Sequence, residues 1–137
     1  MAPERNSRLL WLSIATVYVF QALHLVIPAD AIGGRYSWTA AVAVGMLEAV
    51  LLVACSGLRR DATWAPRLAA WMAGLTGLVF LLYHGLPFDS TVTNPYPGEV
   101  GIAPWIPVVG IIAGSLGTIY FGIVRPRAPD SIEATST

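Results

Sequence analysis

The chain has 137 residues, of which 55% are hydrophobic and only 12% are charged. Charged residues make up about 25% of an ordinary soluble domain. This composition therefore excludes an ordinary soluble domain and indicates a membrane protein. The mean hydropathy of +0.64 agrees. Eight arginines, with no lysine, balance eight acidic residues, so no net positive charge attracts nucleic acid. The arginine-rich, alanine-rich composition is also typical of a bacterial protein.

The first apolar run covers residues 9–27 and contains no formal charge. A hydrocarbon layer about 30 Å thick needs about 20 apolar residues in a helix, so this run is long enough to cross it. Pro28 ends the run because proline cannot continue a helical hydrogen-bond ladder. A cleavable signal peptide is the alternative, with Arg5 and Arg8 as its basic start and residues 29–31 as its cleavage site. Its apolar core would exceed the usual length of about 7–15 residues, which favours a retained helix.

Three more apolar runs follow, each separated from the next by polar, glycine- or proline-containing turns. We therefore expect one all-α domain, a bundle of four transmembrane helices over residues 9–124. Residues 1–8 would form a short segment before it, and residues 125–137 a disordered tail with little to bury. The expected spans are 9–27, 38–58, 68–86 and 104–124.

The arginines predict the orientation of the bundle. Cytoplasmic loops of membrane proteins carry an excess of Lys and Arg. Only Arg35 falls in a loop on the opposite side from the others. Both termini should therefore be cytoplasmic, in a multi-pass protein of the bacterial plasma membrane. The arginines on the cytoplasmic side are Arg5, Arg8, Arg59, Arg60, Arg67, Arg125 and Arg127.

The ends of the first and third spans share a pattern of Phe, His, Pro and Asp. This pattern suggests two tandem helical hairpins. It also places both histidines at a similar depth near the outer surface, where two imidazoles from separate helices can ligate a b-type haem or, with the aspartates, a metal ion. The alternative is that they are ordinary interfacial histidines, and no closely spaced ligand pair is present, so we expect no cofactor. The matching residues are Phe20, His24, Pro28 and Asp30 in the first copy, and Phe80, His84, Pro87 and Asp89 in the second.

Glu48 is the only ionisable side chain near the middle of the second span. A carboxylate there costs a few kcal/mol in contact with lipid, so it should face protein. Ala41, Gly45 and Leu52 share its helical face by spacing, which predicts that another helix approaches on that side.

Two roles for Glu48 remain open from the sequence. In the functional one it binds and releases a proton or a cation, with Gln21 bridging toward His24. In the structural one it is a protonated carboxyl group that bonds to a hydroxyl of the bundle. The candidate hydroxyls are those of Ser13, Thr16 and Thr76.

Small residues four apart indicate close helix packing, within the chain or between copies. In the third span these are Ala70 and Gly74, with Gly77 in the next pair, and in the fourth they are Gly110 and Gly114.

No metalloprotease, serine-hydrolase, dithiol or phosphate-loop motif is present in the sequence. We therefore expect that the protein is not an enzyme. The favoured function is a non-enzymatic accessory or structural subunit of a membrane assembly, with the lipid bilayer and a protein partner or a second copy around it. In size and helix count the chain also resembles the small multidrug resistance family, whose members carry a membrane-embedded glutamate. That resemblance implies a proton-linked transporter of small solutes, although the family's glutamate is in the first helix and Glu48 is in the second. A haem or metal redox protein using His24 and His84 is the third possibility.

Overall fold

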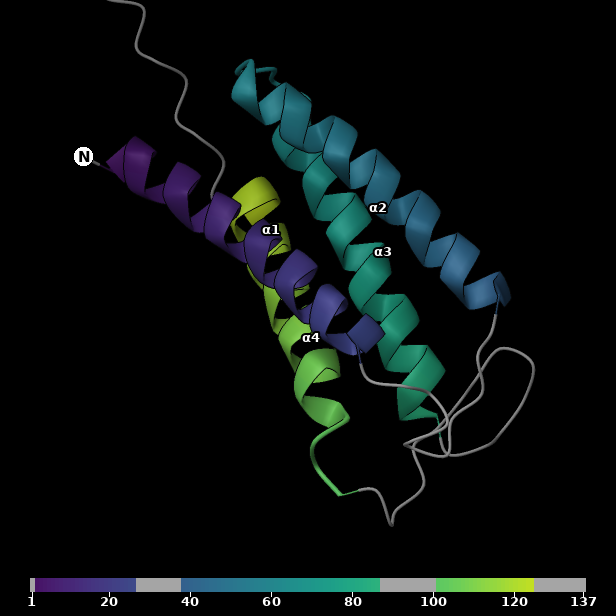
Figure 1. Cartoon of the computed structure of the whole chain (residues 1–137). Coiled ribbons are helices and arrows are strands. Elements are labelled where there is room, and N and C mark those ends of the chain that lie inside the picture. Colours follow the sequence, from purple (N-terminus) through teal and green to yellow (C-terminus); the bar gives the residue numbers. More distant parts are fainter. Residues whose placement is uncertain (1, 27–37, 87–100, 125–137) are drawn as a thin grey trace, which may run out of the picture.

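The structure is a computed structural model that describes residues 2–26, 38–86 and 101–124. In these ranges the chain forms only helices: α1 (Ala2–Val26), α2 (Trp38–Arg59), α3 (Ala65–Gly85) and α4 (Trp105–Ile119), with a short π-helix, η3 (Tyr120–Val124), continuing α4 (Figure 1). Four helical segments, the last made of α4 and η3 together, are long and apolar enough to cross a membrane. The prediction of an all-α chain with four such helices is therefore confirmed.

Two helices start earlier than the predicted spans. α1 begins at Ala2, so residues 2–8 continue the helix instead of preceding it. α3 begins at Ala65 because Pro66 lies in its first turn, where a proline has no helical N–H to lose. The possible cleavage site at residues 29–31 and the tail at 125–137 lie outside the described residues.

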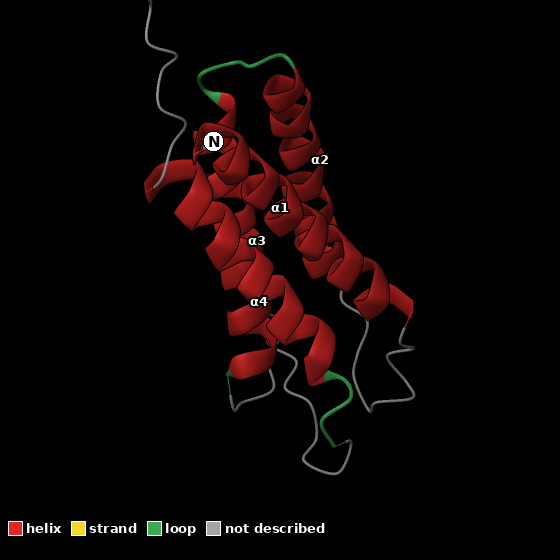
Figure 2. Ribbon diagram, turned by 90° about the vertical axis from the view of Figure 1, so that its left-hand side faces the viewer, coloured by secondary structure: helices red, strands yellow, loops and turns green. Residues whose placement is uncertain are grey.

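The helices pack in the spatial order α1, α4, α3, α2, each running antiparallel to the next along the chain (Figures 1 and 2). α1 lies along α4, α4 along α3, and α3 along α2, whereas the backbones of α1 and α2 barely approach each other. The predicted pair of equivalent hairpins is therefore corrected: α3 and α4 form a packed hairpin, but α1 and α2 do not.

Glycines on α4 explain why α1 packs there. A Cβ atom at position 114 would lie 2.9 Å from the backbone nitrogen of Val17 and 3.0 Å from the carbonyl oxygen of Ser13. A Cβ atom at position 110 would collide with the ring of Phe20. Gly110 and Gly114 thus let the backbone of α1 approach α4 closely.

The contact between α3 and α4 uses small residues in the same way. A Cβ atom at Gly77 would lie 2.8 Å from the Cβ of Ser115, and one at Gly74 would lie 3.1 Å from the side chain of Ile119. Ala70 is buried further along α3. These residues therefore pack within the chain, which is one of the two arrangements that their spacing left open.

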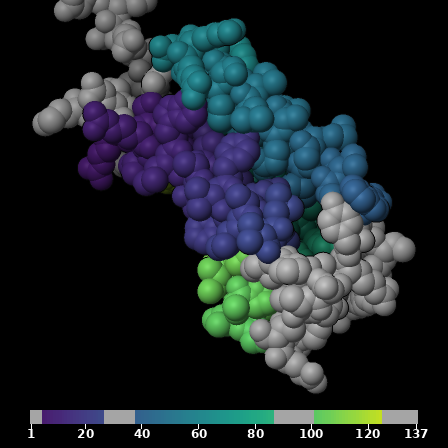
Figure 3. All heavy atoms as spheres, in the orientation of Figure 1, coloured from purple at the N-terminus to yellow at the C-terminus, as the bar shows by residue number. Residues whose placement is uncertain are grey.

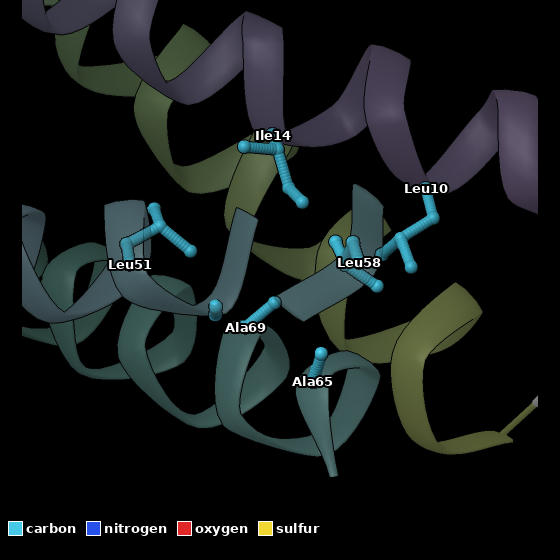
Figure 4. Close-up of a cluster of buried hydrophobic side chains, with 7 residues drawn as sticks. Leu10, Ile14, Leu51, Leu58, Ala65 and Ala69 are labelled. Atoms are coloured by element: carbon cyan, nitrogen blue, oxygen red, sulfur yellow. The ribbon is translucent and has the colours of Figure 1, made fainter. Parts of the chain in front are cut away.

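All five described arginines lie at the end of the bundle where α1 begins and α2 turns into α3; we call it the arginine end. The opposite end, where α1 and α3 finish, is called the histidine end. A cluster of buried apolar side chains fills the arginine half of the bundle (Figure 4). A smaller cluster lies in the histidine half. The first consists of Leu10, Ile14, Leu51, Ala54, Leu58, Ala65 and Ala69, and the second of Val44, Phe80, Val108 and Ile111.

Large apolar side chains also cover the outside of the bundle. Val19, Trp71 and Leu116 are each more than 60% exposed. The helices form a continuous surface along the bundle (Figure 3). Such a surface suits a hydrocarbon environment, since water would leave these side chains unfavourably exposed.

Truncation of Leu51 should destabilise the fold. Leu51 has no exposed surface and lies in the larger apolar cluster. Leu51→Ala is expected to lower the free energy of unfolding by about 2–5 kcal/mol because it leaves a cavity. Unfolding with sodium dodecyl sulfate in mixed micelles, followed by tryptophan fluorescence, measures the change. Leu52→Ala, on the exposed side of α2, is the matched control and should change little.

Candidate functional site

Glu48 lies halfway along α2, between the two apolar clusters. The buried stripe of α2 contains Val44, four residues before it, and Leu51, three residues after it. Gly45 and Leu52 lie on the exposed side instead, and a Cβ atom at Gly45 would have no neighbour within 4 Å. This corrects the sequence-based assignment of the packed face: Glu48 faces the bundle at the edge of the stripe, but not beside Gly45 and Leu52.

Both carboxyl oxygens of Glu48 are buried and have no hydrogen-bond partner. The side chains of Tyr18 and Thr76 are near enough to interact with the carboxyl group, but neither forms a hydrogen bond of acceptable geometry with it. The Tyr18 hydroxyl instead donates to the backbone carbonyl oxygen of Glu48 at 3.1 Å. A buried polar group without a partner costs about 1–3 kcal/mol, so a hydrogen-bond donor or a cation placed beside this carboxyl group would stabilise it.

Each of the other three helices also places a polar side chain in the interior of the bundle. Gln21, Thr76 and Ser115 are buried, and each has a side-chain oxygen without a hydrogen-bond partner. In this way α1, α2, α3 and α4 each place one such side chain in the interior. Ser115 packs against Gly77 of α3, whereas Thr76 is beside Glu48.

Ser13 and Thr16 do not supply Glu48 with a hydrogen bond. The Ser13 hydroxyl donates to the Leu9 carbonyl at 2.8 Å, and the Thr16 hydroxyl donates to the Leu12 carbonyl at 2.9 Å. Such bonds to the preceding turn are common for hydroxyl side chains in helices. Among the proposed hydroxyl partners, only Thr76 is placed beside the carboxyl group.

Tyr18, which contacts Glu48, and Ser115, one of the buried polar side chains, were not selected from the sequence. Tyr18 precedes Gln21 by three residues, so its place on the same side of α1 as Gln21 was readable from the spacing. Ser115 gave no comparable signal, because a single serine in an apolar helix usually bonds to its own backbone.

The structure brings His24 and His84 together at the histidine end. Their ring centroids are 5.2 Å apart and their planes are inclined by 70°, so the rings meet edge to face. Phe80 lies 5.1 Å from His24, and Tyr83 lies 4.9 Å from His84, both also edge to face. His84 is only 4% exposed. The two helices that the shared sequence pattern singled out therefore do meet through their histidines.

This pair does not fit a haem ligated on both faces. The two imidazoles touch each other directly, which leaves no room for a porphyrin between them. A metal ion bound by the two nitrogens would need further ligands. Among the described residues no group of three or more His, Cys, Asp or Glu side chains is placed to hold one. Asp30 and Asp89, predicted as additional ligands, lie outside the described residues.

We compared the chain with known protein families, curated proteins and solved structures. No protein-family model matches the chain, and neither the curated proteins nor the solved structures contain a match. The likeness to the small multidrug resistance family therefore stays one of size and helix count, and the function has to be argued from the residues.

Proposed function

We propose that this chain is a small multi-pass protein of the bacterial plasma membrane that exchanges a proton for a small organic cation at Glu48. The observation that carries the proposal is the Glu48 carboxyl group, which is buried at mid-height of an apolar bundle with both oxygens unpaired. Ionisable residues within membrane helices are expensive, and they commonly mark ion pathways and proton relays.

The membrane location rests on the helices and on their surface. The four helical segments are long enough to span a bilayer, and their outer faces are covered by large apolar side chains. The five described arginines lie at one end, which favours that end as the cytoplasmic one. The N-terminal end of α1 lies there (Figure 1), and so does η3, whose Gly122 packs against Pro66 at the start of α3.

The chemistry follows from what can satisfy the carboxyl group. When protonated, it carries one donor and needs an acceptor; when ionised, it needs donors or a cation. Thr76 and Tyr18 stand beside it without a hydrogen bond of acceptable geometry, so they satisfy neither form of the carboxyl group fully. A proton and an organic cation can therefore compete for one site, which is the minimum needed for proton-linked transport.

Proton release on cation binding tests this proposal. Protein purified in detergent is mixed, in weakly buffered solution, with tetraphenylphosphonium and, separately, with guanidinium. Wild-type protein should release about one proton per chain with at least one probe, because a cation displaces the single proton of Glu48. Glu48→Gln should release none, whereas Gly45→Ala, on the exposed side of the same helix, should behave as wild type. Wild-type protein that releases no proton to either probe contradicts the proposal.

An accessory subunit of a membrane assembly is the second candidate. The observation that favours it is the open face of α2. This helix packs along α3 with its other face, and among the described residues nothing would lie within 4 Å of a Cβ atom at Gly45. Small residues such as Ala41 and Gly45 allow another transmembrane helix to come close. Gly45→Cys in a Cys55→Ala chain, labelled at the new thiol with a photoreactive benzophenone maleimide, tests this: irradiation in native membranes should cross-link the chain to a partner helix if the face is occupied. Failure to cross-link, together with cation-dependent proton release, would leave the exchanger as the better function.

A further inference from the structure

We infer that the Glu48 carboxyl group takes up and releases its proton from the histidine end of the bundle, through a column of polar side chains and bound water, and that the arginine half is closed to it. The use of such a path rests on the proposed exchange of protons, whereas its direction rests on the packing of the two halves.

The column runs along one side of α1. Tyr18 faces Glu48, and His24 faces Phe80 and His84. Gln21 lies one turn from each of them, so it bridges the two levels, which are about 9 Å apart at 1.5 Å per residue. Its side-chain Oε1 is buried without a partner.

On α3 the same interval contains a polar group at each end. Thr76 is beside Glu48, and its hydroxyl is fully buried without a partner; His84, two turns later, touches His24. A buried water needs about two to four polar partners. The unpaired oxygens of Glu48, Thr76 and Gln21, on three different helices, are the partners that water in the proposed column would use.

Among the described residues, the arginine half has no equivalent set of buried polar side chains without partners, although both halves contain an apolar cluster. Leu51 and Ala54 have no exposed surface, and Ile14 has 2%. The hydroxyls of Ser13 and Thr118 in this half donate to the carbonyls of Leu9 and Gly114, which leaves no free donor hydrogen on either. From Glu48 to the end of α2 the distance is about 16 Å of helix, filled mainly by the larger apolar cluster.

Few other titratable groups face Glu48. Tyr18 approaches from α1, and Cys55 follows two turns along α2, on the arginine side, where it lies close enough to Arg59 to interact with it. A thiol is a weak hydrogen-bonding group and does not support a water chain by itself. α3 contributes the neutral Thr76 and, at its end, His84, while α4 has no ionisable side chain between Trp105 and Ile119. Toward the histidine end the polar groups lie on both α1 and α3, whereas toward the arginine end the titratable groups that follow Glu48 on α2 are Cys55 and then Arg59.

Sided labelling with dicyclohexylcarbodiimide, which adds to protonated carboxyl groups in apolar surroundings, tests the direction. The full chain is reconstituted into vesicles, and those with the N-terminus outside are separated by an N-terminal tag. The pH is then varied on one side and clamped on the other, and adducts at Glu48 are counted by mass spectrometry. Above its titration midpoint, the labelling rate should change up to about tenfold per pH unit imposed at the histidine end and less than about twofold at the arginine end.

Variants of the column give a second readout. Gln21→Leu should slow the response of labelling to a pH jump at the histidine end, because it removes the bridging amide. Thr16→Val is the matched control, since Thr16 is on α1 but bonds to its own helix outside the column. Labelling that follows pH at the arginine end, or equally at both ends, overturns the inference, and so does a normal response in Gln21→Leu. Proton release to an added cation is measured independently, so the exchange proposal can survive that result or fall without it.

Discussion

Replacing Glu48 by methionine should stabilise the fold and abolish proton exchange. Methionine has a similar length but no polar atoms, so the variant removes two buried, unpaired oxygens from the interior. Leaving a buried polar group unsatisfied costs about 1–3 kcal/mol, and the free energy of unfolding should rise by a similar amount. Titration with sodium dodecyl sulfate in mixed micelles measures the stability, and proton release on addition of an organic cation measures the exchange.

The direction of the stability change separates a functional carboxyl group from a structural one. If Glu48 were a satisfied member of a hydrogen-bond network, Glu48→Met would break that network and lower the stability. Glu48→Gln is the control, because it keeps two polar atoms at the site but cannot ionise. Its stability should stay close to that of the wild type while proton exchange is lost. A less stable Glu48→Met variant would therefore argue against the proposed role.

The lengths of the apolar runs, and the polar turns between them, were enough to predict the four apolar helices. The second span, expected over residues 38–58, corresponds to α2 at Trp38–Arg59, and the fourth, expected over 104–124, corresponds to α4 with η3. These boundaries were readable because a bilayer sets a minimum length for each apolar run, and polar turns interrupt the runs. The early start of α1 was not readable, since a polar segment in front of an apolar run can be helical or not.

The packed face of α2 was harder to predict. Successive residues of a helix are about 100° apart, so one residue can belong to two overlapping stripes. Ala41, Gly45 and Leu52 fit one face with Glu48, but Val44 and Leu51 fit another face with it equally well. The structure uses the second face, on which Val44 and Leu51 are buried, whereas Leu52 on the first face is exposed. Sequence spacing places Glu48 on both stripes, so it could not decide between them.

The contact between Tyr18 and Glu48 shows a different limit. The two residues are 30 positions apart, on helices whose backbones barely approach. The contact arises because α1 is held by the glycines of α4 and then crosses toward α2. No pattern within α1 or α2 contains that information. The meeting of His24 and His84 was easier to predict, since both lie at a similar distance from the ends of their spans.

The crossing of α1 over α4 is therefore the packing feature on which the site depends, and Gly114→Leu should disrupt it. A Cβ atom at position 114 already meets backbone atoms of α1, which cannot rotate away as a side chain can. We expect a loss of at least about 3 kcal/mol in the free energy of unfolding, the upper end of the usual overpacking cost.

Gly45→Leu is the matched control for this variant, because position 45 has open space within 4 Å and leucine favours helix over glycine. Unfolding in mixed micelles compares the two variants, and proton release shows whether separating α1 from α4 also disables the site. Because Tyr18 and Gln21 are carried by α1, Gly114→Leu should abolish proton release even in micelles where α2, α3 and α4 remain helical by circular dichroism. A variant that keeps wild-type stability and exchange would show that α1 does not position the Glu48 site.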